Sequence, residues 1–363
     1  MYLKKLKLTN FRTYENLELD LEKKINVFVG NNAEGKTNIL ESIYISSITK
    51  SYRTAKDVEC ISLDKDYFRN THTYVLDNGN EKEVEVFLDK SGKKQVKDDG
   101  LKVNRYSDFL GSIPIVVFSP ENMDIVKGSP KNRRKFIDIL ISQVSKKYVI
   151  TLQEYNKLIN LKNTILKNDR KNIDLNYLDI LDEKIAEKIE YISTSRREYV
   201  DKVENFALKI QKSLSNNKEI INLKYLSDFC GKNLEEIKSI LKNSRENDIF
   251  RKTSSKGIGH DDILVLVNDL EVQKYGSQGQ KRTALLSMKI AEFEILKSIK
   301  ETNPIILLDD VFSELDEKRI NFLMEYIKDY QVFITTTEVN SIESDYKKII
   351  FKVRKGTVEK IKN

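Results

Sequence analysis

Two short motifs that serve one phosphate site stand at opposite ends of this 363-residue chain. Near the start, Gly30–Thr37 reads G-x-x-x-x-G-K-T, and near the end Ile305–Asp310 has four aliphatic residues followed by two acids. A glycine motif of this kind wraps phosphate groups with backbone N–H groups, and an acid at the end of a buried strand supplies a metal ligand beside it. Because the two motifs work together, both ends of the chain are predicted to fold as one discontinuous α/β lobe.

The glycine motif has the flanking elements of a P-loop. Residues 25–29 form a short apolar run typical of a buried strand, and apolar residues recur at helical spacing after Thr37. The loop and the positive end of the following helix would face a phosphate, and Lys36 would reach the β- and γ-phosphates and assist catalysis. A chance glycine turn would not have these flanking elements. We expect the nucleotide-binding residues here to be Gly30, Asn31, Asn32, Ala33, Glu34, Gly35, Lys36, Thr37 and Asn38.

The two acids after the aliphatic run predict a magnesium site. Thr37 and Asp309 are the expected metal ligands, because a hydroxyl and a carboxylate suit Mg²⁺ beside bound phosphates. Asp310 is the expected catalytic base, oriented toward the attacking water. The alternative is that both acids only end a strand and cap a helix, which the P-loop makes less favourable. The expected cofactors are therefore ATP and Mg²⁺.

A third motif, Ser277–Gln280, opens a helix whose apolar positions continue to Ile295. Its S-x-x-Q form is that of a capping box, which would stabilise the helix without any further function. Glycines at 276 and 279 also make it a second phosphate-binding helix N-terminus. Since the P-loop covers one side of a triphosphate, a second subunit would have to supply this helix. We therefore expect an ATP-dependent homodimer.

The amino-acid composition and the apolar pattern of the chain change at Pro130. Residues 131–303 contain no proline, and apolar residues repeat at spacings of three and four over most of 137–214. We predict a helical insertion, packed as a lobe in preference to a coiled coil, because strict heptads are not sustained. The expected division is 1–125 for the first part of the ATPase lobe, 126–256 for the helical lobe and 257–363 for the second part of the ATPase lobe.

The cysteines, the hydropathy and the net charge of the chain bear on its cellular location and on its partners. Cys60 and Cys230 have no metal-type spacing, which fits a reducing cytoplasm, and no stretch is apolar enough for a membrane span. The net charge of +7 permits a polyanionic partner. Two basic clusters are candidate DNA contacts, with an ordinary solvated helix face as the alternative for each. The residues concerned are Lys50, Arg53, Lys131, Arg133 and Arg134.

The motifs together resemble the RecF family of ABC-type ATPases that act on chromosomes. The resemblance rests on Tyr275–Thr283, which reads Y-G-S-Q-G-Q-K-R-T, and on 10–14, 118–121, 127–130 and 307–316. It implies an α/β fold, with an ABC-type P-loop ATPase lobe of mixed sheets and helices and an inserted α-helical lobe. It also implies ATP-dependent DNA binding in replication and recombinational gap repair. Such proteins form an ATP-driven dimeric clamp at junctions of single- and double-stranded DNA, and with RecR and RecO they help to load the RecA recombinase.

The resemblance also implies roles for single residues. Ser277, with Gln278, Gly279 and Gln280, would contact the nucleotide of the other subunit, and Thr337 stands at the position of a switch residue. Asp316 would lie near the dimer seam, and Glu121 is a weaker candidate for the loop between the lobes. Asp310 implies slow hydrolysis that serves as a timer. The chain departs from the family at His260, where relatives commonly have arginine.

Two other classes of protein remain as alternatives. The ATPase subunit of another ABC-type system, such as a transporter, would share the P-loop and the dimer, although its signature is usually L-S-G-G-Q. A metabolic P-loop kinase would have no use for Ser277.

Overall fold

The computed structural model describes residues 1–168, 173–338 and 346–361. These residues form two compact units, 1–123 with 292–363 and 124–291. The first boundary lies close to the predicted one, but the second lies later than the predicted position after residue 256. Residues 257–291, which were expected in the ATPase lobe, belong to the helical unit.

The first unit contains two six-stranded sheets. The antiparallel sheet has the order β2-β1-β4-β5-β6-β7 and the mixed sheet the order β15-β14-β3-β13-β12-β8. The strands are β1 Tyr2–Phe11, β2 Tyr14–Asp20, β3 Ile25–Val29, β4 Tyr67–Val75, β5 Glu81–Asp89, β6 Lys94–Asp98, β7 Leu101–Lys102, β8 Ile115–Phe118, β12 Ile305–Asp309, β13 Val332–Thr336, β14 Lys348–Arg354 and β15 Thr357–Ile361. The helices are α1 Lys36–Ile48, α2 Tyr106–Phe109 and α10 Glu317–Ile327, together with the second part of α9.

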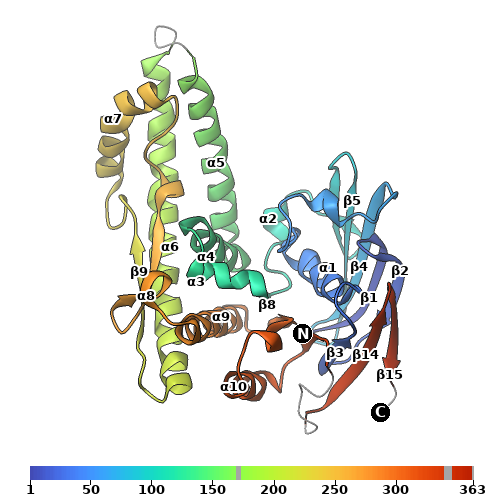
Figure 1. Ribbon diagram of the computed structural model, residues 1–363. Helices are drawn as coiled ribbons and strands as arrows, with labels where there is room; N and C mark the ends of the chain where they lie inside the picture. The colour runs from blue at the N-terminus through green and yellow to red at the C-terminus, as the bar shows by residue number, and fades with distance from the viewer. Residues whose placement is uncertain (169–172, 339–345, 362–363) are drawn as a thin grey trace. The chain divides into compact units, whose positions relative to one another are not determined.

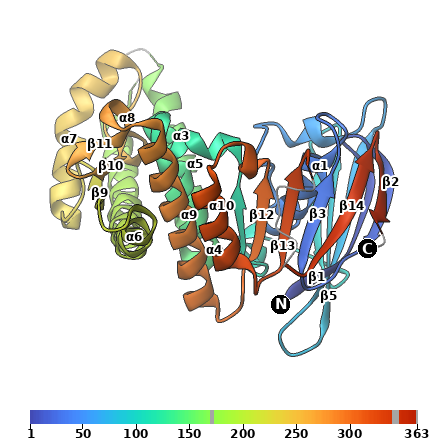
Figure 2. The same ribbon diagram turned by 60° about the horizontal axis from the view of Figure 1, so that its bottom comes forward.

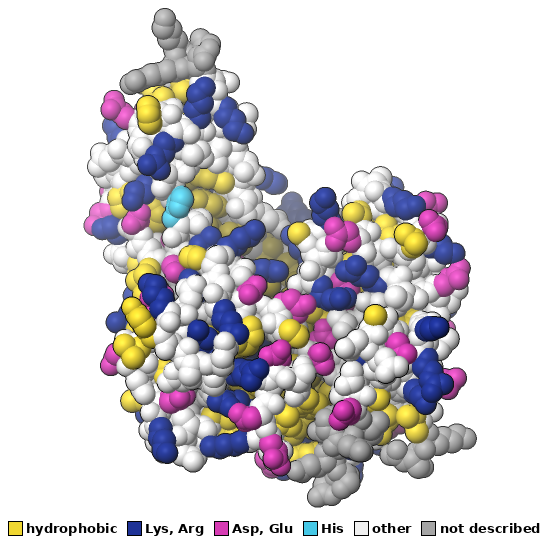
Figure 3. Space-filling model, in the orientation of Figure 1, with side chains coloured by type: hydrophobic (Ala, Val, Ile, Leu, Met, Phe, Trp, Pro, Cys, Tyr) yellow, Lys and Arg dark blue, Asp and Glu magenta, His cyan; other side chains and the backbone are white. Residues whose placement is uncertain are grey.

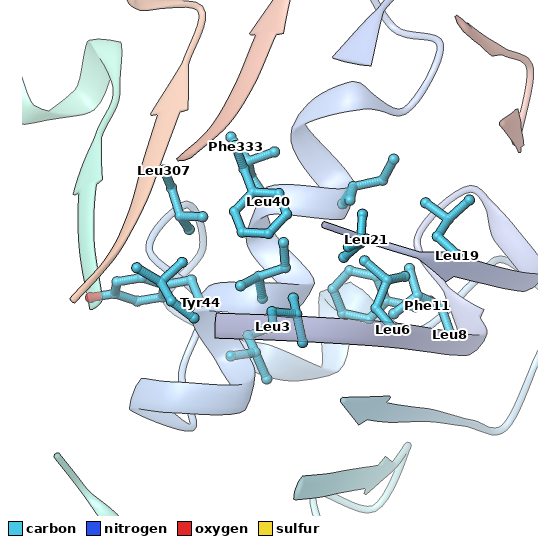
Figure 4. Close-up of a cluster of buried hydrophobic side chains, with 14 of the residues drawn as sticks. Leu3, Leu6, Leu8, Phe11, Leu19, Leu21, Leu40, Tyr44, Leu307 and Phe333 are labelled. Atoms are coloured by element: carbon cyan, nitrogen blue, oxygen red, sulfur yellow. The ribbon is translucent and has the colours of Figure 1, made fainter. Parts of the chain in front are cut away.

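Helix α1 lies between the two sheets (Figure 1) and contacts β1, β4 and β5 on one side and β8, β12 and β13 on the other. Eleven of its 13 residues are buried, which explains why it lacks a polar face. Figure 4 shows side chains of both sheets around it, with Leu40 and Tyr44 of α1 close to Leu307 and Phe333. The P-loop helix is thus the central element of the core.

The mixed sheet places both motifs at one edge. β3 pairs in parallel with β13, and β13 pairs in parallel with β12, as Figure 2 shows. The carboxyl ends of these strands therefore meet at the same edge of the sheet. The P-loop follows β3 and the two acids stand at the end of β12, so the predicted union of the two chain ends is confirmed.

The second unit is mainly helical. Its helices are α4 Pro130–Val144, α5 Lys146–Leu166, α6 Leu175–Ser215, α7 Leu234–Arg251 and α8 Val272–Tyr275, with α3 Met123–Lys127 at its start and the first part of α9 Gln278–Lys300 at its end. Its strands are β9 Ile221–Leu226, β10 Asp262–Val267 and β11 Leu270–Glu271.

The prediction of a helical insertion over 126–256 did not include the strand β9. Ile221, Leu223 and Tyr225 are buried and alternate with more exposed neighbours, which is the period of a strand. β9 pairs antiparallel with β10 over its whole length. This pairing joins 262–267 to the helical unit and is the physical reason why the second boundary falls later than expected.

Candidate nucleotide site

The P-loop turns between β3 and α1 at a glycine that no other residue could replace without strain. Gly35 is the N-cap of α1 and has φ +110°, and a Cβ there would lie 2.7 Å from the Thr13 hydroxyl. The Tyr14 hydroxyl donates to the Gly35 carbonyl at 3.1 Å and fixes the turn. The first N–H groups of α1 are thereby held at the end of the sheet, where an anion can accept from them.

The lysine of the loop is a buried cation held by neutral acceptors. Lys36 Nζ donates to the carbonyls of Gly30 and Asn31 at 2.7 and 2.8 Å. Burial lowers the pKa of Lys36, and Asp310, Glu34 and Asp309 oppose this shift. Among the described residues no carboxylate lies within ion-pair distance of this ammonium. A cation in this setting favours an anionic ligand.

The first acid is fixed by three hydroxyl groups. Asp309 Oδ1 accepts from Thr37 and Thr335 at 2.8 Å each, and Oδ2 accepts from Tyr52 at 2.8 Å. Burial raises the pKa of Asp309, and the three hydroxyl donors oppose that shift. Burial and the nearby Asp309 raise the pKa of Tyr52 well above its ordinary value, so this tyrosine acts as a donor. The carboxylate therefore has one orientation.

The second acid has an unusual backbone. Asp310 has φ +51°, in the left-handed region, and its N–H donates to Thr335 Oγ1 at 2.9 Å. The same hydroxyl donates to Asp309, so Thr335 fixes both acids. A pocket opens beside them, and the residues that line it come from the P-loop, α1, the following loop and the ends of β12 and β13. They are Asn32, Ala33, Gly35, Lys36, Thr37, Asn38, Arg53, Asp310 and Thr335.

Two oxygen donors, one lining this pocket and one buried directly behind it, fit magnesium. The Thr37 hydroxyl and the Asp309 carboxylate are hard oxygen ligands only 2.8 Å apart, and no cluster of three or more His, Cys, Asp or Glu side chains suited to a metal occurs in the described ranges. Mg²⁺ typically takes one or two protein carboxylates and completes its shell with phosphates and water. The pair therefore suits a metal that arrives with a nucleotide.

The Ser277 motif has the predicted cap. The Ser277 hydroxyl accepts from the Gln280 N–H at 3.2 Å, and the Gln280 side chain accepts from the Ser277 N–H at 2.9 Å. Ser277 and Gln278 are exposed, and Gly279 and Gln280 are partly exposed. The capping interpretation is confirmed. The motif lies at the surface of the helical unit.

The sequence prediction missed two residues that hold Asp309 in place, Thr335 and Tyr52. Thr335 is one of three consecutive threonines, and the family resemblance favoured Thr337, which is exposed and follows the end of β13. Tyr52 lies between the basic residues Lys50 and Arg53 and carries no motif of its own. All five residues of β13 are buried, so no period singles out Thr335, and both residues required the structure.

The predicted DNA contacts differ in their exposure and in their partners. Lys50 and Lys131 are exposed, as expected. Arg53 instead donates to Asn38 at 3.1 Å and to the buried Glu41 at 3.3 Å, and it lines the nucleotide pocket. The surface roles of Arg133 and Arg134 require correction, as described next.

Arg133 is buried, so its expected role as a surface DNA contact is wrong. Its side chain is 5% exposed and donates to both oxygens of Asp262 at 2.7 and 2.9 Å. Arg134 donates to the Asp261 carbonyl, and burial lowers its pKa. The 3.6-residue period places position 133 on the inner face of α4, and the basic run in the sequence concealed this.

The weaker candidates are all at the surface. Glu121 and His260 are exposed. Asp316 is the N-cap of α10 and accepts from the Arg319 N–H at 3.0 Å. The structure thus gives Asp316 a capping role and leaves its side chain half exposed.

Comparison with known proteins decides the family. The model of the RecF/RecN/SMC N terminal domain matches residues 2–359. A protein of Clostridium tetani named DNA replication and repair protein RecF is 40% identical over 367 residues, which is 98% of this chain and 99% of that one. The chain belongs to the RecF family. The protein of the same name in Clostridium botulinum strain ATCC 19397 is 41% identical to this chain over 348 residues, which is 94% of each chain.

A solved RecF structure agrees with this assignment. It contains ATP and is described as a recombination mediator of the RecFOR pathway, and it matches 99% of this chain and 98% of its own with a TM-score of 0.93 and 34% identity. An Smc head domain of Pyrococcus furiosus matches with a TM-score of 0.57 at 18% identity, which shows a shared fold alone. The predicted ABC-type P-loop ATPase fold with an inserted helical lobe is confirmed. Within the described residues no helix has the length and apolar character needed to cross a membrane.

Proposed function

We propose that this RecF family member is an ATP-dependent DNA-binding protein of DNA replication and recombinational gap repair. The observation that carries the proposal is the fixed Thr37–Asp309 pair beside the P-loop, in a chain whose relatives are named for DNA replication and repair. The family relative solved with ATP supports ATP as the nucleotide.

ATP binding is assigned to residues 30–38. The N–H groups at the start of α1 would donate to phosphate oxygens, and Lys36 would exchange the carbonyls of Gly30 and Asn31 for the β- and γ-phosphates. Thr37 and Asp309 would hold Mg²⁺, which supplies neutralisation of phosphate charge when it is bound. Asp310 would orient a water and accept its proton, as in a slow ATPase that acts as a timer.

Completion of the site is assigned to a second copy of the chain. Ser277 to Gln280 are at least partly exposed at the start of a long helix, where N–H groups and a hydroxyl can meet a γ-phosphate. ATP bound at the P-loop of one subunit would therefore draw in the Ser277 motif of the other. Thr337, which is exposed after the end of β13, would be the switch residue that responds to the γ-phosphate.

The dimer is proposed to close on DNA at junctions of single and double strands. RecR is the proposed direct partner, with RecO and RecA acting downstream, and the cytoplasm is the proposed location. The RecFOR pathway named for the solved relative supports these partners. Recognition of DNA shape is favoured, because the sequence contains no base-reading motif.

The deciding experiment is fluorescence anisotropy of a labelled gapped duplex, with and without Mg²⁺-ATP at fixed salt. We expect tight binding only with ATP. Ser277→Arg should abolish ATP-dependent dimerisation in sedimentation while retaining monomer ATP binding, and Asp310→Asn should retain ATP and hold the dimer together.

Each outcome has a separate meaning. Absence of DNA binding with and without ATP would overturn the DNA assignment and favour another ABC-type partner system. Normal turnover of ATP by Asp310→Asn would overturn the role of Asp310 as base. Unchanged dimerisation of Ser277→Arg would overturn the shared site.

A further inference from the structure

The basic excess of the chain lies entirely in its helical unit. Residues 124–291 contain 32 Lys and Arg residues against 23 Asp and Glu residues, a net charge of +9, whereas the other unit has 31 against 33, a net charge of −2. A polyanion would therefore be attracted to the helical unit. The question is which face of that unit it meets.

Helix α5 differs from its neighbours in its lack of acids. Its only carboxylate, Glu154, forms an ion pair with Lys188 of α6 at 2.9 Å, and residues 155–168 contain no Asp or Glu. α6 instead mixes acids with bases along its length, and exposed pairs such as Arg197–Asp201 and Lys202–Glu198 cancel each other. α6 has the pattern of a solvated face, and α5 does not.

From Gln153 onward most exposed residues of α5 and its C-terminal end fall on one side of the helix, with the exposed Glu154 and Asn156 at the margins of that side. Their spacing of three and four residues puts them in a single stripe of basic and hydrogen-bonding groups with one apolar residue, Leu161, and the stripe is roughly 22 Å long at 1.5 Å per residue. Figure 3 shows Lys and Arg but no Asp or Glu side chains along the upper right of the unit, where α5 runs in Figure 1. The stripe consists of Gln153, Lys157, Asn160, Leu161, Thr164, Lys167 and Asn168.

The chemistry of this stripe matches a sugar-phosphate backbone. Lysine, amide and hydroxyl side chains are the usual donors to phosphate and sugar, and these contacts carry no base sequence. An acidic protein surface would also attract lysines, but the amide and the hydroxyl between them, Asn160 and Thr164, are groups that contact phosphate and sugar.

We propose that the exposed face of α5 is the surface on which DNA lies, through its phosphates. The proposal rests on the proposed function. The α5 face takes the place of Arg133 as the expected DNA contact of the helical unit, because Arg133 is buried and forms an ion pair with Asp262. Lys157 and Lys167 are the phosphate contacts, and Asn160 and Thr164 are additional hydrogen-bonding groups between them.

The test compares two double variants with the same change of charge. Lys157→Gln with Lys167→Gln alters the α5 face, and Lys209→Gln with Lys212→Gln alters exposed lysines of α6 in the same unit. Affinity for a gapped duplex is measured with Mg²⁺-ATP at several salt concentrations. Loss of two phosphate contacts should reduce the slope of log K against log salt by about 2, equally for duplexes of different sequence.

The expected result is weaker binding and a reduced salt slope in the α5 variant, with a much smaller change in the α6 variant. ATP affinity and circular dichroism should be unchanged in both. Equal weakening by the two variants would mean that only net charge matters and would overturn the proposal, as would wild-type affinity in the α5 variant. Failure of the wild-type protein to bind DNA would instead overturn the proposed function.

Discussion

The nucleotide site and the helical unit use buried polar groups in opposite ways. The ATPase unit has a buried ion pair of its own, Glu41 with Arg12, but at the nucleotide site Asp309 is surrounded by hydroxyl donors and Lys36 donates its hydrogen bonds only to carbonyls. In the helical unit they form closed ion pairs, such as Lys162 with Asp182 and Asp248 at 2.8 and 3.0 Å. The first arrangement leaves a charge available for a ligand, and the second leaves none.

This difference separates binding residues from structural ones. A buried cation with only neutral acceptors favours an incoming anion, whereas a buried cation between carboxylates stabilises the packing that surrounds it. In the helical unit the residues available to a partner are therefore the exposed ones. The same change, removal of one buried cation, should then affect function in one unit and stability in the other.

The largest effect is expected from Arg196→Met in the helical unit. Arg196 is 3% exposed and donates to Asp138 and Asp261, and their carboxylates raise its pKa well above the ordinary value although burial opposes this. Its removal leaves two carboxylates with tyrosine hydroxyl donors but without their cation, which should cost roughly 3–5 kcal/mol. Urea unfolding followed by circular dichroism measures the loss.

The matched control for Arg196 is Lys188→Met on the same helix. Its ion pair with Glu154 is largely solvated, with side chains 26% and 49% exposed, so the change should cost less than about 1 kcal/mol. ATP affinity should remain normal in both variants. Equal loss of stability in the two would contradict the distinction between buried and exposed pairs.

The next effect is expected from Lys36→Met in the ATPase unit. Here the free energy of unfolding should change by no more than about 1 kcal/mol, because the cation has only carbonyl partners. ATP affinity should fall roughly 10- to 100-fold, the value of a lost hydrogen bond to a charged group. Isothermal titration with ATP and urea unfolding together test this, and a variant that loses stability but keeps ATP would reverse the comparison.

How far the sequence predicts the molecule also differs between the units. The P-loop, the strand ending at Asp309 and the cap at Ser277 follow from local patterns, so they were predictable residue by residue. The pairing of β9 with β10 is a contact between distant segments, and no local pattern fixes it. The roles of Arg133 and Tyr52 could not be predicted for the same reason. Burial and contact partners decide these roles, whereas the sequence shows only basic residues around each position.

A smaller effect is expected from Thr335→Val, which tests whether one residue can contribute both to folding stability and to the nucleotide site. Valine keeps the shape but leaves the Asp310 N–H without its acceptor and removes one of the three hydroxyl donors of Asp309. The free energy of unfolding should fall by about 1–3 kcal/mol, and ATP turnover should fall with it. Thr336→Val is the control, since its hydroxyl contacts the backbone of Glu338 and not the acids. Wild-type stability in the Thr335 variant would contradict the bridging role.

The smallest effect is expected from Tyr52→Phe, which removes one donor from Asp309 and leaves the ring in place. Tyr52 packs edge-on against Tyr44 with ring centroids 5.2 Å apart, and its hydroxyl alone holds Oδ2. Since a single neutral hydrogen bond contributes about 0.5–1.5 kcal/mol, the Mg²⁺ concentration that half-saturates ATP binding should rise roughly two- to tenfold. ATP binding in the presence of EDTA should not change. Tyr44→Phe is the matched control, because it removes a hydroxyl from the same ring pair without touching the carboxylate. Equal Mg²⁺ dependence in the two variants would mean that Thr37 and Thr335 suffice to orient Asp309.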